Sequence, residues 1–140
     1  MKRFEEYLKE KVVKKVTPDI NRANSLKKEA LNRKNFIFKL LETQKLNDEN
    51  ANYFIELAYD VIIELVRGKM LEKGFVAIGN YAHEAEVSFL GKLGLSEDKI
   101  LLLDDLRKIR NKILYYGKKF DKQFALKVLN LMKEMVKKLA

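Results

Sequence analysis

The fold is decided by residues 57–66, which read Leu57-Ala58-Tyr59-Asp60-Val61-Ile62-Ile63-Glu64-Leu65-Val66. The apolar side chains in and just before this stretch recur at the spacing of one helix face: Phe54, Leu57, Ala58, Val61, Ile62 and Leu65. The stretch carries two acids and is far shorter than the roughly 20 apolar residues of a membrane span. We therefore predict a core helix that begins after a cap at Asn47 or Asp48 and ends between Gly68 and Gly74.

The chain on either side of this helix has the same periodicity, and no segment alternates as a β-strand would. On the N-terminal side, residues 2–16 predict one helix, and Thr17-Pro18 predicts the start of a second that runs to about Thr43. On the C-terminal side, the expected helices begin and end at these residues: Asn80 to Gly91 or Gly94, Ser96 to about Tyr116 and Gly117, and Asp121 onward. Short connections favour antiparallel neighbours. The expected fold is all-α, an up-and-down antiparallel helical bundle of five to six helices in a single domain, residues 1–140.

The composition narrows the classes of site that the chain can hold. Its 140 residues include no cysteine and one histidine, His83. Disulfides and thiolate metal sites are therefore excluded, and a His-rich metal site or a Ser-His-Asp triad is disfavoured. We expect no cofactor and no metal. The first residues lack the apolar segment of a signal peptide, which predicts a cytoplasmic protein without a membrane partner.

Positive charge is concentrated in two blocks of a chain whose net charge is +9. Residues 1–45 hold 13 bases against 6 acids, and residues 105–140 hold 11 bases against 3 acids. If the helices of these blocks are neighbours, they form one positive surface that attracts phosphates. The alternative is that the lysines are simply the solvated faces of amphipathic helices.

Residues 100–120 place an arginine beside a buried stripe. The stripe is formed by Leu102, Leu106, Ile109 and Ile113. At about 100° per residue, Arg110 falls on the edge of this arc, where a guanidinium needs a carboxylate, a helix end or a partner chain. Arg107 and Asn111 lie on the adjacent flank, and Tyr115 and Tyr116 precede the helix end. Such groups suit a phosphate or a base. The alternative is that Arg110 forms an intramolecular salt bridge, with Asn111 exposed and both tyrosines packed.

The segment Arg110-Asn111-Lys112-Ile113-Leu114-Tyr115 resembles the signature of the HEPN superfamily, in which an Arg and a polar neighbour precede a His by four to six residues. Tyr81-Ala82-His83-Glu84-Ala85 and the helix from Leu103 to Asn111 are similar to small stand-alone prokaryotic members. The resemblance implies a helical bundle that forms a homodimer and binds RNA or nucleotide phosphates at the dimer cleft. It further implies metal-independent RNA cleavage in many members, and in others a toxin–antitoxin pairing with a nucleotidyltransferase.

The sequence departs from this signature at one position, because Tyr115 stands where the His is expected. A phenol with a pKa near 10 is a poor general base at neutral pH, so the departure weakens the ribonuclease expectation more than the binding expectation. The predicted site has Arg110 as the charge contact, Asn111 orienting it, and Tyr115 stacking or donating a hydrogen bond; Arg110 and Tyr115 are also the candidate catalytic residues.

Arg107 and His83 complete the set of predicted binding residues. His83 either supplies the missing imidazole or is a structural histidine bonded to a neighbour. Two other functions stay open for the whole chain: a non-catalytic helical interaction module, and a basic protein that coats nucleic acid without a defined site.

Overall fold

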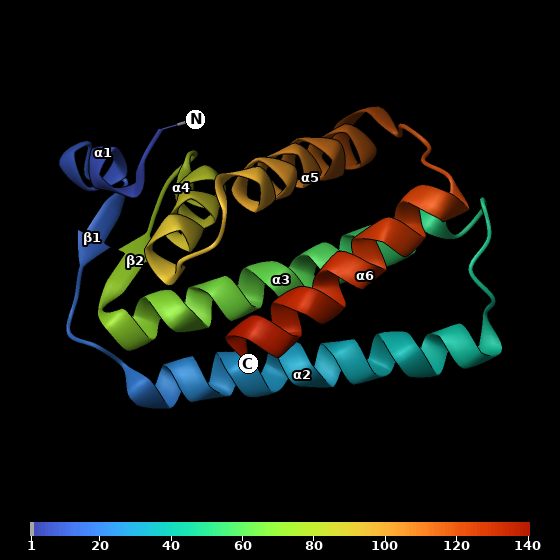
Figure 1. Cartoon of the computed structure of the whole chain (residues 1–140), viewed down its shortest axis with the longest axis horizontal. Helices are drawn as coiled ribbons and strands as arrows, with labels where there is room; N and C mark the ends of the chain where they lie inside the picture. Colours follow the sequence, from blue (N-terminus) through green and yellow to red (C-terminus); the bar gives the residue numbers. More distant parts are fainter. Residues whose placement is uncertain (1) are drawn as a thin grey trace.

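The computed structural model describes residues 2–140 and confirms the all-α fold (Figure 1). Within these residues the chain is 74% helical, with six α-helices and one two-stranded sheet. The elements are α1 (Phe4–Lys9), β1 (Val13–Lys15), α2 (Ile20–Thr43), α3 (Ala51–Lys73), β2 (Phe75–Ala77), α4 (Ala82–Ser88), a 3₁₀ helix (Phe89–Leu93), α5 (Glu97–Tyr116) and α6 (Lys122–Leu139). None of the described helices is both long and apolar enough to cross a membrane.

Helix α3 is the centre of the molecule, and the other long helices pack around it (Figure 1). Side chains on every side of α3 are buried, among them Phe54, Ile55, Tyr59, Ile62 and Met70. A helix that is apolar all round is stable only when it is covered by neighbours. The four long helices alternate in direction, so α2 and α5 run opposite to α3 while α6 runs parallel to it. Residues 57–66 therefore lie in the core of the bundle.

The N-terminal segment differs from the predicted single helix over residues 2–16. Helix α1 ends at Lys9, and Val13–Lys15 form β1, which pairs antiparallel with β2. In this register Val13 lies opposite Ala77, and Lys15 opposite Phe75. The break falls at Lys11, which has a left-handed backbone (φ 61°). The prediction that the chain has no strand was wrong here because the partner strand lies about sixty residues away and leaves no local pattern.

Three predicted helix starts were displaced. Helix α2 is capped by Asp19, whose carboxylate accepts from the Arg22 amide at 3.0 Å, and not by Thr17. Helix α3 begins after Asn50, because Asn47 and Asp48 belong to the preceding turn. Helix α4 begins after Tyr81 and not after Asn80.

The caps of the last two helices are confirmed. The Ser96 hydroxyl accepts from the Lys99 amide, and the Asp121 carboxylate accepts from the Phe124 amide. Gly74, Gly94 and Gly117 end their helices with left-handed backbones, as the predicted stops require.

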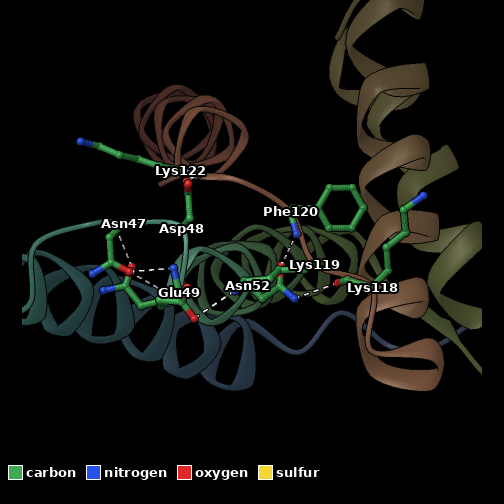
Figure 2. A network of polar contacts seen from close by, with 9 residues as sticks. Asn47, Asp48, Glu49, Asn52, Lys118, Lys119, Phe120 and Lys122 are labelled. Atoms are coloured by element: carbon green, nitrogen blue, oxygen red, sulfur yellow. Dashed lines mark hydrogen bonds and ion pairs between the residues drawn. The ribbon is translucent and has the colours of Figure 1, made fainter.

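A polar network fixes the start of α3 against the connection between α5 and α6 (Figure 2). The Asn52 amide donates to the Lys118 carbonyl at 2.8 Å and its oxygen accepts from the Phe120 amide at 2.9 Å. Asp48 accepts from the Lys122 amide at 2.9 Å. These contacts hold the C-terminal end of α5, and with it the predicted site, at a defined position on α3.

The two basic blocks contribute neighbouring helices. Helices α2 and α6 both pack on α3, and the Lys133 ammonium of α6 lies 5.2 Å from the ring centre of Phe38 on α2. Only Ala23, Ala30 and Ile37 of α2 are fully buried, so most of its lysines and arginines remain exposed. Helices of the two basic blocks are therefore neighbours, which is the condition for the blocks to form one positive surface.

Candidate functional site

The predicted site is organised around a tyrosine that the sequence analysis did not select. Tyr59 of α3 is buried, and side chains from two other helices lie near its ring. The Arg110 guanidinium of α5 lies 5.3 Å from the ring centre, within range of a cation–π interaction. The His83 imidazole of α4 lies parallel to the same ring, with centroids 6.5 Å apart and planes at 8°. Helices α3, α4 and α5 thus bring Arg110 and His83 to one place.

Arg110 is only partly paired at this place. Its Nη2 lies 3.5 Å from the Asp60 Oδ1, which is at the outer limit of an ion-pair hydrogen bond. Its Nε is buried and has no hydrogen-bond partner. The Arg110 side chain is 24% exposed and that of Asp60 is 39% exposed. Because a guanidinium carries five N–H donors, Arg110 retains donors that no protein group uses.

Arg107 lies one helical turn before Arg110 and is held more firmly. Its Nε donates to the buried carboxylate of Asp104 at 3.0 Å, and its Nη2 lies 3.8 Å from the Glu84 Oε1. Asp104 is also paired with Lys108 at 3.3 Å. Glu84 links α4 to α5, so Arg107 helps to fix the helix that carries His83.

Arg67 of α3 forms the strongest ion pair in this part of the molecule. Its Nε and Nη2 contact the two oxygens of the buried Glu86 at 2.6 and 3.2 Å, a bidentate arrangement. The same Nη2 lies 3.4 Å from the His83 Nε2. We call Tyr59, Arg67, His83, Arg107 and Arg110 the arginine cluster.

The surroundings of His83 favour its neutral form. Burial lowers the pKa of His83, the Glu86 carboxylate opposes this, and the charges of Arg67, Arg110 and Arg107 lower the pKa further. Burial also raises the pKa of Tyr59, whose hydroxyl has no hydrogen-bond partner in the described chain. At pH 7 the cluster therefore contains a neutral imidazole and a protonated phenol among three guanidinium groups.

The other two predicted site residues lie apart from this cluster. Tyr115 is 77% exposed, and five residues after Arg110 it points about 140° away around the helix. Asn111 is half-buried and makes no side-chain hydrogen bond that is found within residues 2–140. The structure brings together Arg107, Arg110 and His83, and it leaves Asn111 and Tyr115 outside.

Sequence reasoning missed Tyr59, Asp60 and Arg67, although a signal was present. All three are polar residues in the predicted core helix, which was assigned to the core because of its apolar spacing. A charged group on a helix that is otherwise buried needs a partner: Asp60 is paired with Arg110 of α5 and Arg67 with Glu86 of α4.

The described residues contain no group of three or more His, Asp or Glu side chains arranged to hold a metal ion. No family model matches the chain, and no curated protein and no solved structure is significantly similar to it.

Proposed function

We propose that this protein binds RNA or nucleotide phosphates at the arginine cluster, with Arg110 as the principal charge contact. The observation that carries the proposal is the incomplete pairing of Arg110, with one contact at 3.5 Å and a buried Nε that lacks a partner. A phosphate accepts paired N–H bonds from a guanidinium at shorter distances and with more energy than a neutral acceptor. The resemblance to the HEPN superfamily at Arg110 supports the same assignment.

Binding at this cluster requires an exchange of partners. The acids Asp60, Glu84, Glu86 and Asp104 already balance the local arginines, so phosphate is not attracted by excess charge alone. Among the described residues, Asp60 is the one carboxylate paired with Arg110, at 3.5 Å, and its side chain is 39% exposed, whereas Arg107 has the close contact with Asp104 at 3.0 Å beside its longer one with Glu84. A phosphate oxygen replaces Asp60 at Arg110 while Arg67 and Arg107 keep their carboxylates and hold the site in shape.

Metal-independent RNA cleavage is a second candidate function, and the position of His83 favours it. The imidazole that is missing at Tyr115 is available from α4, because the His83 and Arg110 side chains both lie near the Tyr59 ring, at 6.5 Å and 5.3 Å from its centre. A neutral His83 accepts the proton of a ribose 2′-hydroxyl as its oxygen attacks phosphorus, and the 5′-oxygen leaves with its bonding electron pair and takes a proton from water. Arg110 then stabilises the charge on the phosphoryl oxygens.

The exposed end of α5 supports the proposal of a homodimer. Leu114, Tyr115 and Tyr116 follow Arg110 and are 49%, 77% and 84% exposed. Exposed aromatic side chains of this kind are enriched in protein interfaces. A second copy, or a nucleotidyltransferase antitoxin, would cover this end of α5 and bring its own groups next to Arg110.

The proposal is tested by binding of a labelled single-stranded RNA and of AMP to wild type, Arg110→Ala and Lys112→Ala in EDTA. Lys112 is the matched control, since it is an exposed base on the same helix without an ion pair among residues 2–140. We expect Arg110→Ala to weaken binding roughly 10- to 100-fold, as loss of a charged hydrogen bond does, and Lys112→Ala to change it little. Equal effects of the two variants would contradict a site at Arg110.

The same samples separate the other functions. Cleavage of the RNA in EDTA that is lost in His83→Gln supports the ribonuclease function, and intact RNA in all samples contradicts it. The dimer is tested by the mass in solution, where a monomer would rule out a cleft between two copies. A dimer that dissociates in Arg110→Ala, without RNA binding in wild type, would instead indicate an interaction module.

A further inference from the structure

A pocket of about 430 Å³ lies between the first turns of α2, the C-terminal half of α3, β2 and α4, and His83 is among its lining residues. Its wall is mostly apolar and is formed by Leu26, Met70, Leu71, Phe75, Val76 and Ala77. Its polar groups are Arg22, Arg67, His83 and Glu86. A volume of this size, with an apolar wall and a few convergent polar groups, is typical of small-molecule sites.

The charges of the pocket select an anion. Glu86 is buried and is neutralised by its bidentate pair with Arg67. Arg22 also lines the pocket, and no ion pair joins its side chain to an acidic residue within residues 2–140; the Asp19 carboxylate accepts only from its backbone amide. One positive charge therefore remains over an apolar wall.

We infer that this pocket binds a small organic anion, an apolar ring system or chain that carries one carboxylate or phosphate group. The apolar body lies against Met70, Leu71 and Phe75, and the anionic group binds Arg22. The anion contact at Arg22 is distinct from the phosphate contact at Arg110, which does not line the pocket, although Arg67 and His83 belong to both the pocket and the arginine cluster.

Calorimetric titration with four probes tests the inference. The probes are 2-naphthoate and 2-naphthyl phosphate, which have both features, 2-naphthylmethanol, which lacks the charge, and inorganic phosphate, which lacks the apolar body. We expect both anions with rings to bind at one site per chain, and the other two probes to bind at least about tenfold more weakly, as loss of a charged hydrogen bond or of the buried apolar area predicts. The relative affinity of the two anions shows whether carboxylate or phosphate is preferred.

Arg22→Ala supplies the decisive variant, and Lys28→Ala, an exposed base on the same helix outside the pocket, is its control. Arg22→Ala should weaken 2-naphthoate binding about tenfold and leave RNA binding unchanged, while Lys28→Ala and Arg110→Ala leave 2-naphthoate binding unchanged. Equal binding of the alcohol and the acid, no binding of either anion, or insensitivity to Arg22→Ala would overturn the inference. If the wild-type protein binds 2-naphthoate but does not bind RNA, only the proposed function is contradicted.

Discussion

Arg110 has more hydrogen-bond donors than the protein uses, and Asp60 is the group that competes for them. The contact of 3.5 Å between a guanidinium and a carboxylate that is 39% exposed is of the kind worth about 0.2–1 kcal/mol. The cation–π contact with Tyr59 holds the guanidinium plane in place without consuming a donor. The residue is therefore positioned by an aromatic ring and left available to a stronger anion.

Asp60→Asn is accordingly expected to increase affinity. Removal of the competing carboxylate should strengthen RNA or AMP binding about two- to fivefold, the range that corresponds to a partly exposed ion pair. Glu56→Gln, one turn earlier on α3 and without an ion pair among residues 2–140, is the control for net charge. Titration of the three proteins with AMP measures the difference. An equal gain in both variants would show that only total charge matters.

His83 makes the stability of the protein depend on pH in a defined direction. Its folded-state pKa is lowered by burial and by the neighbouring arginines, so the imidazole takes up a proton more easily in the unfolded chain. Stability is therefore lost as pH falls below about 6.5, the ordinary pKa of histidine. Burial raises the pKa of Glu64, which acts in the opposite direction at lower pH.

This pH dependence is tested by comparing the free energy of unfolding of wild type and of His83→Gln at two pH values. Urea unfolding at pH 7.5 and 5.5 should show that wild type loses more stability on acidification than the variant does. A smaller or equal loss in wild type would contradict a neutral His83 in the folded protein. An NMR titration of the imidazole then gives its pKa directly.

At the scale of the element, the turn after α3 is the most constrained point of the fold. Gly74 ends α3 with φ at +84°, and a Cβ placed there would lie 2.6 Å from the carbonyl oxygen of Val16. The Val16 amide in turn donates to the Gly74 carbonyl at 2.8 Å. This contact joins the end of the core helix to β1 and starts the small sheet that borders the pocket beside α4.

Gly74→Ala is therefore expected to lower the free energy of unfolding more than the same substitution at another glycine with a left-handed backbone. The backbone conformation alone should cost roughly 1–2 kcal/mol at either site. Gly94, with φ at +80° and no atom near the added Cβ, is the control for this cost. The contact with the Val16 oxygen should add roughly 1–3 kcal/mol at Gly74. Chemical denaturation of both variants tests this; equal losses would show that the close approach is relaxed at no cost.

At the scale of the whole molecule, features that depend on local sequence were predictable and those that depend on distant partners were not. The caps at Ser96 and Asp121 and the stops at Gly74 and Gly117 each satisfy helix ends with neighbouring residues, so the sequence contains their cause. Strand β1 was missed because its hydrogen bonds come from β2.

The residues of the candidate site also separate into those that the local sequence could predict and those that it could not. Arg110 could be selected because its place at the edge of an apolar stripe requires a partner. Asp60 and Tyr59 could not be assigned as its partners, since they lie fifty residues earlier and the packing of α5 on α3 decides the contact. Tyr115 was grouped with Arg110 because it occupies the position of the signature His close by in the sequence, whereas the helix turns its exposed side chain away from Arg110.

The whole molecule also offers RNA a second means of attraction, the exposed bases of α2 and α6 on adjacent helices. Such a surface binds phosphates without a defined site, and its affinity falls steeply with salt. The arginine cluster should add a contribution that depends on one residue and persists when the general attraction is screened.

The measurement that tests the central claim most directly is the affinity for single-stranded RNA as a function of salt, for wild type, Arg110→Ala and Lys112→Ala. A specific contact at Arg110 predicts that Arg110→Ala binds at least about tenfold more weakly at every salt concentration, while Lys112→Ala stays close to wild type. Three curves that coincide, each falling steeply with salt, would contradict the claim and assign all binding to the basic surface.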